Sequence, residues 1–97
     1  MKTIEELRAD IDNIDTEIKK LLEQRFALST EVGVIKAASN RRVFDGVREQ
    51  QILSSINSDS SLKYGYEISN IYRDIFKLSK NLQSKIADVR KDDGIKD

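Results

Sequence analysis

The sequence predicts an all-α fold with three helices per chain and a very long first helix, and three observations support this class. Apolar residues recur every three or four positions over long stretches, which is the periodicity of an amphipathic helix. No stretch shows the alternation of a half-buried strand. Proline is absent from the 97 residues, so no residue forces a long helix to break.

The first helix is expected from about Ile4 to Ala38. Thr3 and Glu6 have the spacing of a capping box at its start. Its apolar positions, called the seam below, are Leu7, Ile11, Ile14, Ile18, Leu21, Leu28, Val32 and Ile35. A helix of about 34 residues is roughly 50 Å long, whereas a compact chain of this length has a radius of gyration near about 12–13 Å. One monomer cannot bury the seam, so we expect an interlocked homodimer.

Two shorter segments complete the fold. A second helix is expected from about Val43 to Ile56 and a third from about Leu62 to Arg90, because the turn-like stretches "ASNRR" and "NSDSS" separate the three. We assign residues 1–90 to one helical domain. The tail 91–97, "KDDGIKD", is expected to be frayed.

Composition excludes several classes of function. The 17 basic and 17 acidic residues balance, unlike the basic surface of a nucleic-acid binder. Cysteine and histidine are absent, which excludes disulfides, thiolate metal sites and histidine catalysis, and we expect no metal or cofactor. The start "MKTIEELRADID" lacks the apolar core of a secretory signal, and no apolar run could span a membrane. We therefore expect a cytoplasmic protein with no membrane or nucleic-acid partner.

Arg25 interrupts the seam. The apolar rhythm predicts an aliphatic residue at this position, between Leu21 and Leu28. A single arginine there would ordinarily reach water or pair with a glutamate. Lys36, however, follows eleven residues later and returns to within about 20° of the same helix face, about 16 Å along the axis. Two long cationic side chains on one face can close around a small anion.

Other polar residues fall beside the predicted apolar stripes, although each alone would be an ordinary boundary or surface residue. Ser79 and Gln83 lie one turn apart on the third helix. Arg8 is roughly 25 Å from Arg25 along the first helix, so it could reach the same site only from a partner chain. The second helix has three charged residues on one side: Asp45, Arg48 and Glu49.

Together these residues predict a helical pocket with several cations, a carboxylate, a hydroxyl and an amide. Buried unpaired cations are costly, so we expect an anionic ligand to complete the site, and two or more cations favour a dicarboxylate. The pocket has no activated nucleophile. Chemistry there would depend on holding a reactive conformation and stabilising developing charge.

The chain resembles the small all-helical class of chorismate mutases, type II. The stretches that carry this resemblance are "LRADIDNIDTEIKKLLEQR", "EVGVIK", "VFDGVREQQIL" and "SKNLQ", and they extend from about Ile4 to Ile86. The resemblance implies the [3,3] rearrangement of chorismate to prephenate, in the biosynthesis of phenylalanine and tyrosine. It also implies a homodimer in which Arg8 is donated across subunits.

The resemblance also implies individual roles. Arg25 and Arg8 of the partner subunit would bind the substrate carboxylates. Lys36 and Gln83 would donate hydrogen bonds to the ether oxygen of the breaking C–O bond, and Lys36 would also touch a carboxylate.

The remaining roles concern the second and third helices. Glu49 would accept a hydrogen bond from the ring hydroxyl, with Asp45 beside it. Arg48 would order the pocket near Glu49, and Ser79 would lie near a substrate carboxylate.

Three alternatives stay open from the sequence. An isochorismate pyruvate-lyase has a similar fold and cationic pocket, although "VFDGVREQ" favours the mutase. A non-catalytic dimerisation module would tolerate alanine at Arg25, Lys36 and Gln83 with little loss except stability. A mutase that works poorly alone could also be activated by a partner enzyme.

Overall fold

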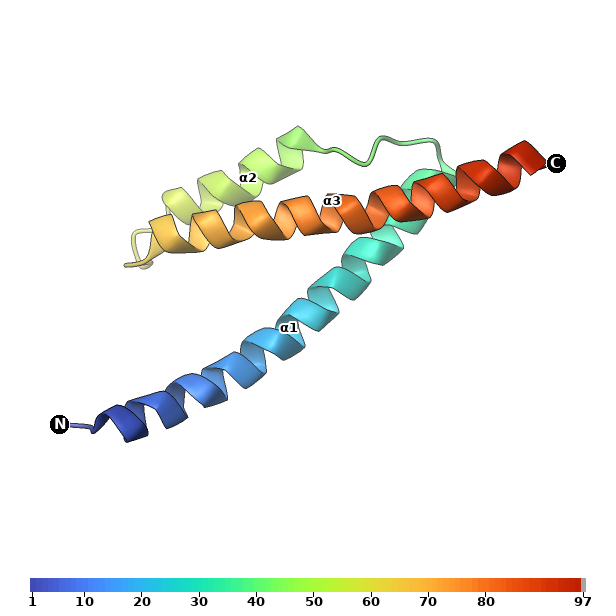
Figure 1. Cartoon of the computed structure of the whole chain (residues 1–97). Helices are drawn as coiled ribbons and strands as arrows, with labels where there is room; N and C mark the ends of the chain where they lie inside the picture. Colours follow the sequence, from blue (N-terminus) through green and yellow to red (C-terminus); the bar gives the residue numbers. More distant parts are fainter. Residues whose placement is uncertain (97) are drawn as a thin grey trace.

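The structure is a computed structural model that describes the backbone of residues 1–96 and the side chains of residues 1–89. It confirms the all-α fold with a long first helix. The described residues form three helices and no strand: α1 (Ile4–Ala38), α2 (Gly46–Asn57) and α3 (Gly65–Lys96). α2 runs beside the first half of α3. The C-terminal part of α1 lies against α3, and the N-terminal half of α1 projects away from it (Figure 1).

The start of α1 follows from local side-chain chemistry. The Thr3 hydroxyl accepts a hydrogen bond from the Glu6 backbone N–H at 3.1 Å, and the Glu6 carboxylate accepts one from the Thr3 N–H at 3.3 Å. These two bonds form the predicted capping box. The helix ends at Ala38, as expected, and Asn40 follows with a positive φ of 55°, a conformation that asparagine tolerates better than most residues.

α2 and α3 begin later than predicted. The Asp45 carboxylate accepts a hydrogen bond from the Arg48 N–H at 3.0 Å, so α2 begins at Gly46 rather than near Val43. In the turn before α3, the hydroxyl and backbone N–H of Ser61 both donate to Asp59, and these bonds hold the pKa of that carboxyl below its usual value.

α3 also extends further than predicted, from Gly65 to Lys96, where the sequence suggested an end near Arg90. No proline interrupts this segment, so the backbone hydrogen bonds of the helix can continue. The fraying of the tail 91–97, whose side chains lie outside the described residues, stays a prediction.

The chain buries little apolar surface by itself. Its extents are 66 × 28 × 14 Å and its radius of gyration is 17.8 Å, well above the roughly 12–13 Å of a compact chain this long. The most buried apolar side chains are Leu53, Ile75 and Phe76, all at the packing of α3 on its neighbours. Every seam residue keeps between 44% and 61% of its surface exposed. The seam therefore lacks an apolar partner within the described part of the chain.

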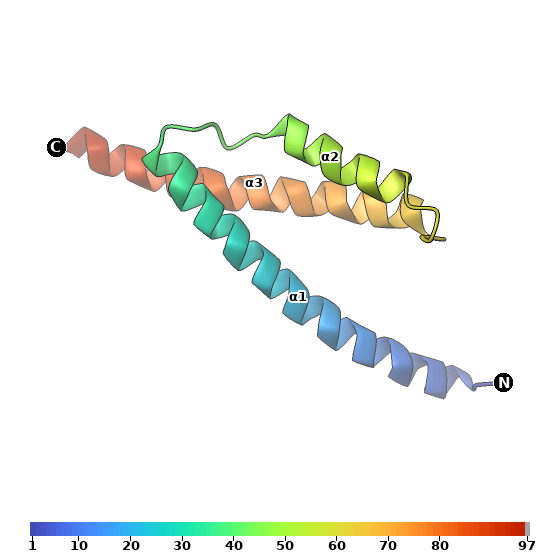
Figure 2. The same cartoon turned by 180° about the vertical axis from the view of Figure 1, so that it is seen from behind.

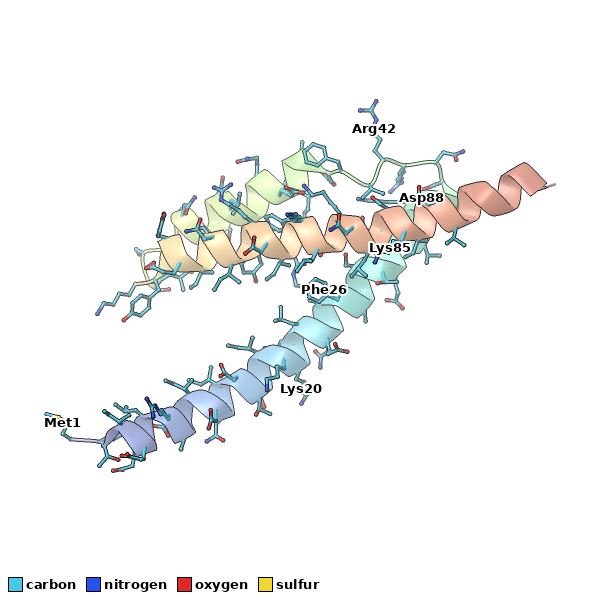
Figure 3. The ribbon with its side chains drawn as sticks, in the orientation of Figure 1. Met1, Lys20, Phe26, Arg42, Lys85 and Asp88 are labelled. Carbon is cyan, nitrogen blue, oxygen red and sulfur yellow. The ribbon has the colours of Figure 1, made fainter. Side chains whose placement is uncertain are left out.

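Both views show the same open arrangement. α1 carries its N-terminal half away from α2 and α3, also when seen from behind (Figure 2). Lys20 lies on this projecting half, and Phe26 lies closer to the approach of α1 to α3 (Figure 3). Within the described helices there is no apolar stretch long enough to cross a bilayer.

Candidate functional site

A cleft with a volume of ≈ 540 Å³ lies where α1, the loop 39–45, α2 and α3 meet. Five cationic and two acidic side chains line it, and we call it the cationic cleft: Arg25, Lys36, Arg41, Arg48 and Lys80, with Asp45 and Glu49. Apolar residues including Leu28, Val32 and Ile52 form the rest of the wall. A surplus of positive charge against apolar walls favours an anionic ligand with an apolar body.

Arg25 leaves the seam to lie against α3. Its guanidinium lies over the rings of Tyr72 and Phe76, with Cζ at 5.6 and 5.9 Å from the ring centroids. Its Nη1 donates to the Ser79 hydroxyl at 3.4 Å. Among the described side chains, no carboxylate lies within ion-pair distance of Arg25. Aromatic and hydroxyl contacts thus position this cation without neutralising its charge.

Lys36 and the loop 39–45 form one wall of the cleft. The Lys36 ammonium donates to the backbone carbonyl of Val43 at 3.0 Å, which fixes the loop against α1. Arg41 lines the cleft, whereas its neighbour Arg42 points away from the helices (Figure 3). Asp45 both lines the cleft and caps α2.

Gln83 is buried at the contact between α3 and α1. Its Nε2 donates to the Ser29 backbone carbonyl at 2.9 Å and to the Ser29 hydroxyl at 3.0 Å. The carbonyl fixes the orientation of the amide, because the flipped amide would place two acceptors together. One N–H is thereby committed to α1. The other bonds the Ser29 hydroxyl, and a change of the Ser29 side-chain rotamer would free this second N–H for a ligand.

Gly33 allows the close approach that makes this contact. A Cβ at Gly33 would lie 2.9 Å from Gln83 Cγ and 3.2 Å from Gln83 Cα. Since the Cα belongs to the backbone, the two helices would have to separate to admit a methyl group.

Gly33→Ala should therefore lower the free energy of unfolding by about 1–3 kcal/mol. This is expected even though alanine is more favourable than glycine in a helix by about 1 kcal/mol. The free energy of unfolding in urea, measured at a fixed protein concentration, tests this. Gly65→Ala is the matched control, because its Cβ would meet only Ile56 O at 3.7 Å, an ordinary contact. Equal stabilisation by both substitutions would contradict the close approach.

Glu49 and Lys80 form an ion pair across the cleft wall. Lys80 Nζ lies 3.2 Å from Glu49 Oε2, with 35% and 22% of the two side chains exposed. The same ammonium lies 4.9 Å from the centroid of the Phe44 ring. One lysine of α3 therefore contacts both α2 and the loop 39–45.

The cleft brings together six of the eight residues singled out from the sequence: Arg25, Lys36, Asp45, Arg48, Glu49 and Gln83. Ser79 is buried behind it and reaches it through Arg25. Arg8 belongs to the N-terminal part of α1 and is not among the residues that line the cleft of its own chain.

Sequence reasoning missed two cationic residues of the cleft. Lys80 could have been found, because it precedes Gln83 by three residues and so shares its helix face. Arg41 gave no such signal, because it lies in a loop where no helical periodicity fixes the direction of a side chain.

Comparison with known proteins agrees with this geometry. Residues 7–84 match the family described as chorismate mutase type II. The chain is 34% identical over 91 residues to a bifunctional chorismate mutase/prephenate dehydratase of Aquifex aeolicus (strain VF5), and the match covers 89% of this chain and 25% of that protein. The chain thus spans about a quarter of the length of this curated relative. Because the family match extends over most of the helical chain, the protein belongs to the type II chorismate mutase family.

Proposed function

We propose that the protein is an isomerase that converts chorismate to prephenate in the cationic cleft. The observation that supports this most directly is the placement of Arg25, Lys36 and Gln83 from two different helices around one cleft with surplus positive charge. Chorismate carries two carboxylates on an apolar framework. Such a ligand complements a cation that forms no ion pair with any carboxylate among the described side chains, as is the case for Arg25.

The proposed reaction is intramolecular, so the protein has to supply conformation and electrostatics rather than a covalent partner. Arg25 binds one carboxylate and holds the substrate against the apolar wall. The Lys36 ammonium and the second N–H of Gln83 donate to the ether oxygen, which gains negative charge as the C–O bond breaks. Glu49 accepts a hydrogen bond from the ring hydroxyl.

Three further residues support this arrangement. Asp45 holds the start of α2 through its bond to the Arg48 N–H. The Arg48 side chain adds positive charge beside Glu49. Ser79 orients Arg25 through the bond described above.

We further propose that the protein acts as a homodimer. The eight seam residues keep nearly half or more of their surface exposed, which is unfavourable for a monomer in water. Full burial stabilises each aliphatic side chain by about 1.5–3 kcal/mol. A second copy offers an identical apolar helix, so a two-fold pairing covers both seams at once. In such a dimer, Arg8 of the partner subunit enters the cleft.

Sedimentation equilibrium at low micromolar concentration should therefore give twice the mass of the 11.1 kDa chain. Ile14→Asp, which places a charge in the seam away from the cleft, should lower both the dimer fraction and the helical circular dichroism signal. A folded and active monomer would contradict both the dimer and the role of Arg8.

Chorismate depletion by the purified protein tests the reaction itself. Prephenate should accumulate as chorismate disappears, and a parallel incubation with isochorismate should release no pyruvate. Pyruvate from isochorismate alone would identify a lyase instead. If the isolated chain is slow, addition of extract from the native host tests for an activating partner enzyme. Loss of neither substrate under any condition would leave the dimerisation module as the function.

A further inference from the structure

Lys80 has no role in the reaction proposed above, yet it lines the cleft. Its ammonium lies 3.2 Å from Glu49 Oε2, and about two thirds of its side chain is buried, since 35% is exposed. The Phe44 ring is 4.9 Å from the same ammonium, and the face of an aromatic ring attracts a cation. A carboxylate and a ring therefore hold this lysine in place.

Glu49 creates an electrostatic problem for the proposed reaction. Its carboxylate has to accept a hydrogen bond from a substrate that itself carries two negative charges. Like charges a few ångströms apart repel strongly where water is partly excluded, and only 22% of the Glu49 side chain is exposed. An unpaired Glu49 would therefore oppose binding of the substrate it helps to orient.

We propose that Lys80 is a positioning residue that neutralises Glu49 and orients its carboxylate. The inference rests on the proposed mutase function. The ion pair leaves Glu49 a good acceptor, because an ammonium at one oxygen leaves lone pairs on both oxygens for the substrate hydroxyl. It also removes the net negative charge that would repel the substrate carboxylates.

Four variants test this through the net charge of the pair. Lys80→Met leaves the pair with a charge of −1 and should raise KM about tenfold, the size of one charge–charge interaction at a partly exposed site. Glu49→Gln leaves it at +1 and should lower kcat without raising KM. Lys80→Met with Glu49→Gln returns the pair to neutral, so KM should fall back towards wild type while kcat stays as low as in Glu49→Gln. Lys80→Arg should keep KM near wild type.

Lys77→Met is the matched control, because Lys77 is an exposed lysine on the same helix outside the cleft. It should leave both constants unchanged. A KM in the double variant as high as in Lys80→Met would mean that Lys80 binds substrate directly, and would overturn the proposal.

A second measurement separates this inference from the mutase function. Urea unfolding of the wild type, Lys80→Met, Glu49→Gln and the double variant gives the coupling free energy between Lys80 and Glu49 without any substrate. Favourable coupling with no turnover of chorismate by the wild type would retain the ion pair and reject the mutase function. Absence of coupling, with chorismate turnover intact, would reject the positioning role alone.

Discussion

Arg8→Ala and Arg25→Ala chains should each be nearly inactive, and a mixture of the two should recover about a quarter of wild-type activity. Each substitution removes a charged donor to a substrate carboxylate, which costs about 2–5 kcal/mol, or roughly 30- to 5,000-fold in kcat/KM. Random exchange makes half of the dimers heterodimers. Each heterodimer has one site with Arg25 from one chain and Arg8 from the other, and one site with neither. The measurement is the rate of chorismate loss before and after subunit exchange.

A chain with both substitutions provides the control. Exchanged with an equal amount of wild type, it should halve the wild-type activity, because every site in the heterodimer then lacks one arginine. If each site were contained within a single chain, subunit exchange would change the rate of chorismate loss in neither experiment. Unchanged rates, under conditions where labelled subunits are seen to exchange, would therefore show that Arg8 does not cross to the partner.

The long helix was the most predictable part of the fold. Thr3 and Glu6 form the capping box that the sequence indicated, because a cap depends on residues within one turn. The start of α2 was less predictable. Val43 and Phe44 are apolar, so the sequence predicts them as part of the helix, but they lie in the loop that joins α1 to α2. The Asp45 cap then sets the first helical residue.

Helical register also accounts for the part of the site that could be predicted. Arg25 and Lys36 line one cleft because eleven residues make just over three turns of a helix. Contacts between helices are a different matter. The Gln83–Ser29 hydrogen bonds depend on how closely α1 and α3 approach at Gly33, and nothing in the local pattern fixes that distance.

The same limit applies to charge pairing. The sequence places Glu49 among charged residues on one side of its own helix and the family resemblance directs it at a substrate hydroxyl, whereas the structure pairs it with Lys80 of α3. A sequence shows which side of a helix a charged residue occupies, but only the packed structure shows which charge faces it. Arg25 illustrates the point, because its contacts are with two aromatic rings and a hydroxyl of α3.

Lys36→Met should lower kcat by about 10²–10³-fold with a smaller change in KM, the usual cost of removing one preorganised donor to developing negative charge. Methionine keeps most of the length and apolar volume of the lysine stem but has no charge and no donor. Steady-state kinetics with chorismate give both constants, and circular dichroism with sedimentation confirms the fold and the dimer. Lys20→Met is the control on the same helix. Lys20 is exposed and lies about 200° around α1 from the seam residue Ile18, so its loss should leave kcat unchanged.

Lys36 also donates to the Val43 carbonyl at 3.0 Å, so a loss of turnover could reflect a loosened loop 39–45 rather than a lost donor to the substrate. Lys36→Arg separates the two roles. A guanidinium is long enough to reach the carbonyl and keeps the charge, but its planar donors cannot reproduce the position of a compact ammonium. If Lys36 acts on the ether oxygen, the arginine variant should stay well below wild type in kcat while its unfolding free energy matches that of wild type. Wild-type turnover in Lys36→Arg, with low turnover in Lys36→Met, would assign Lys36 to the loop and leave the ether oxygen to Gln83 alone.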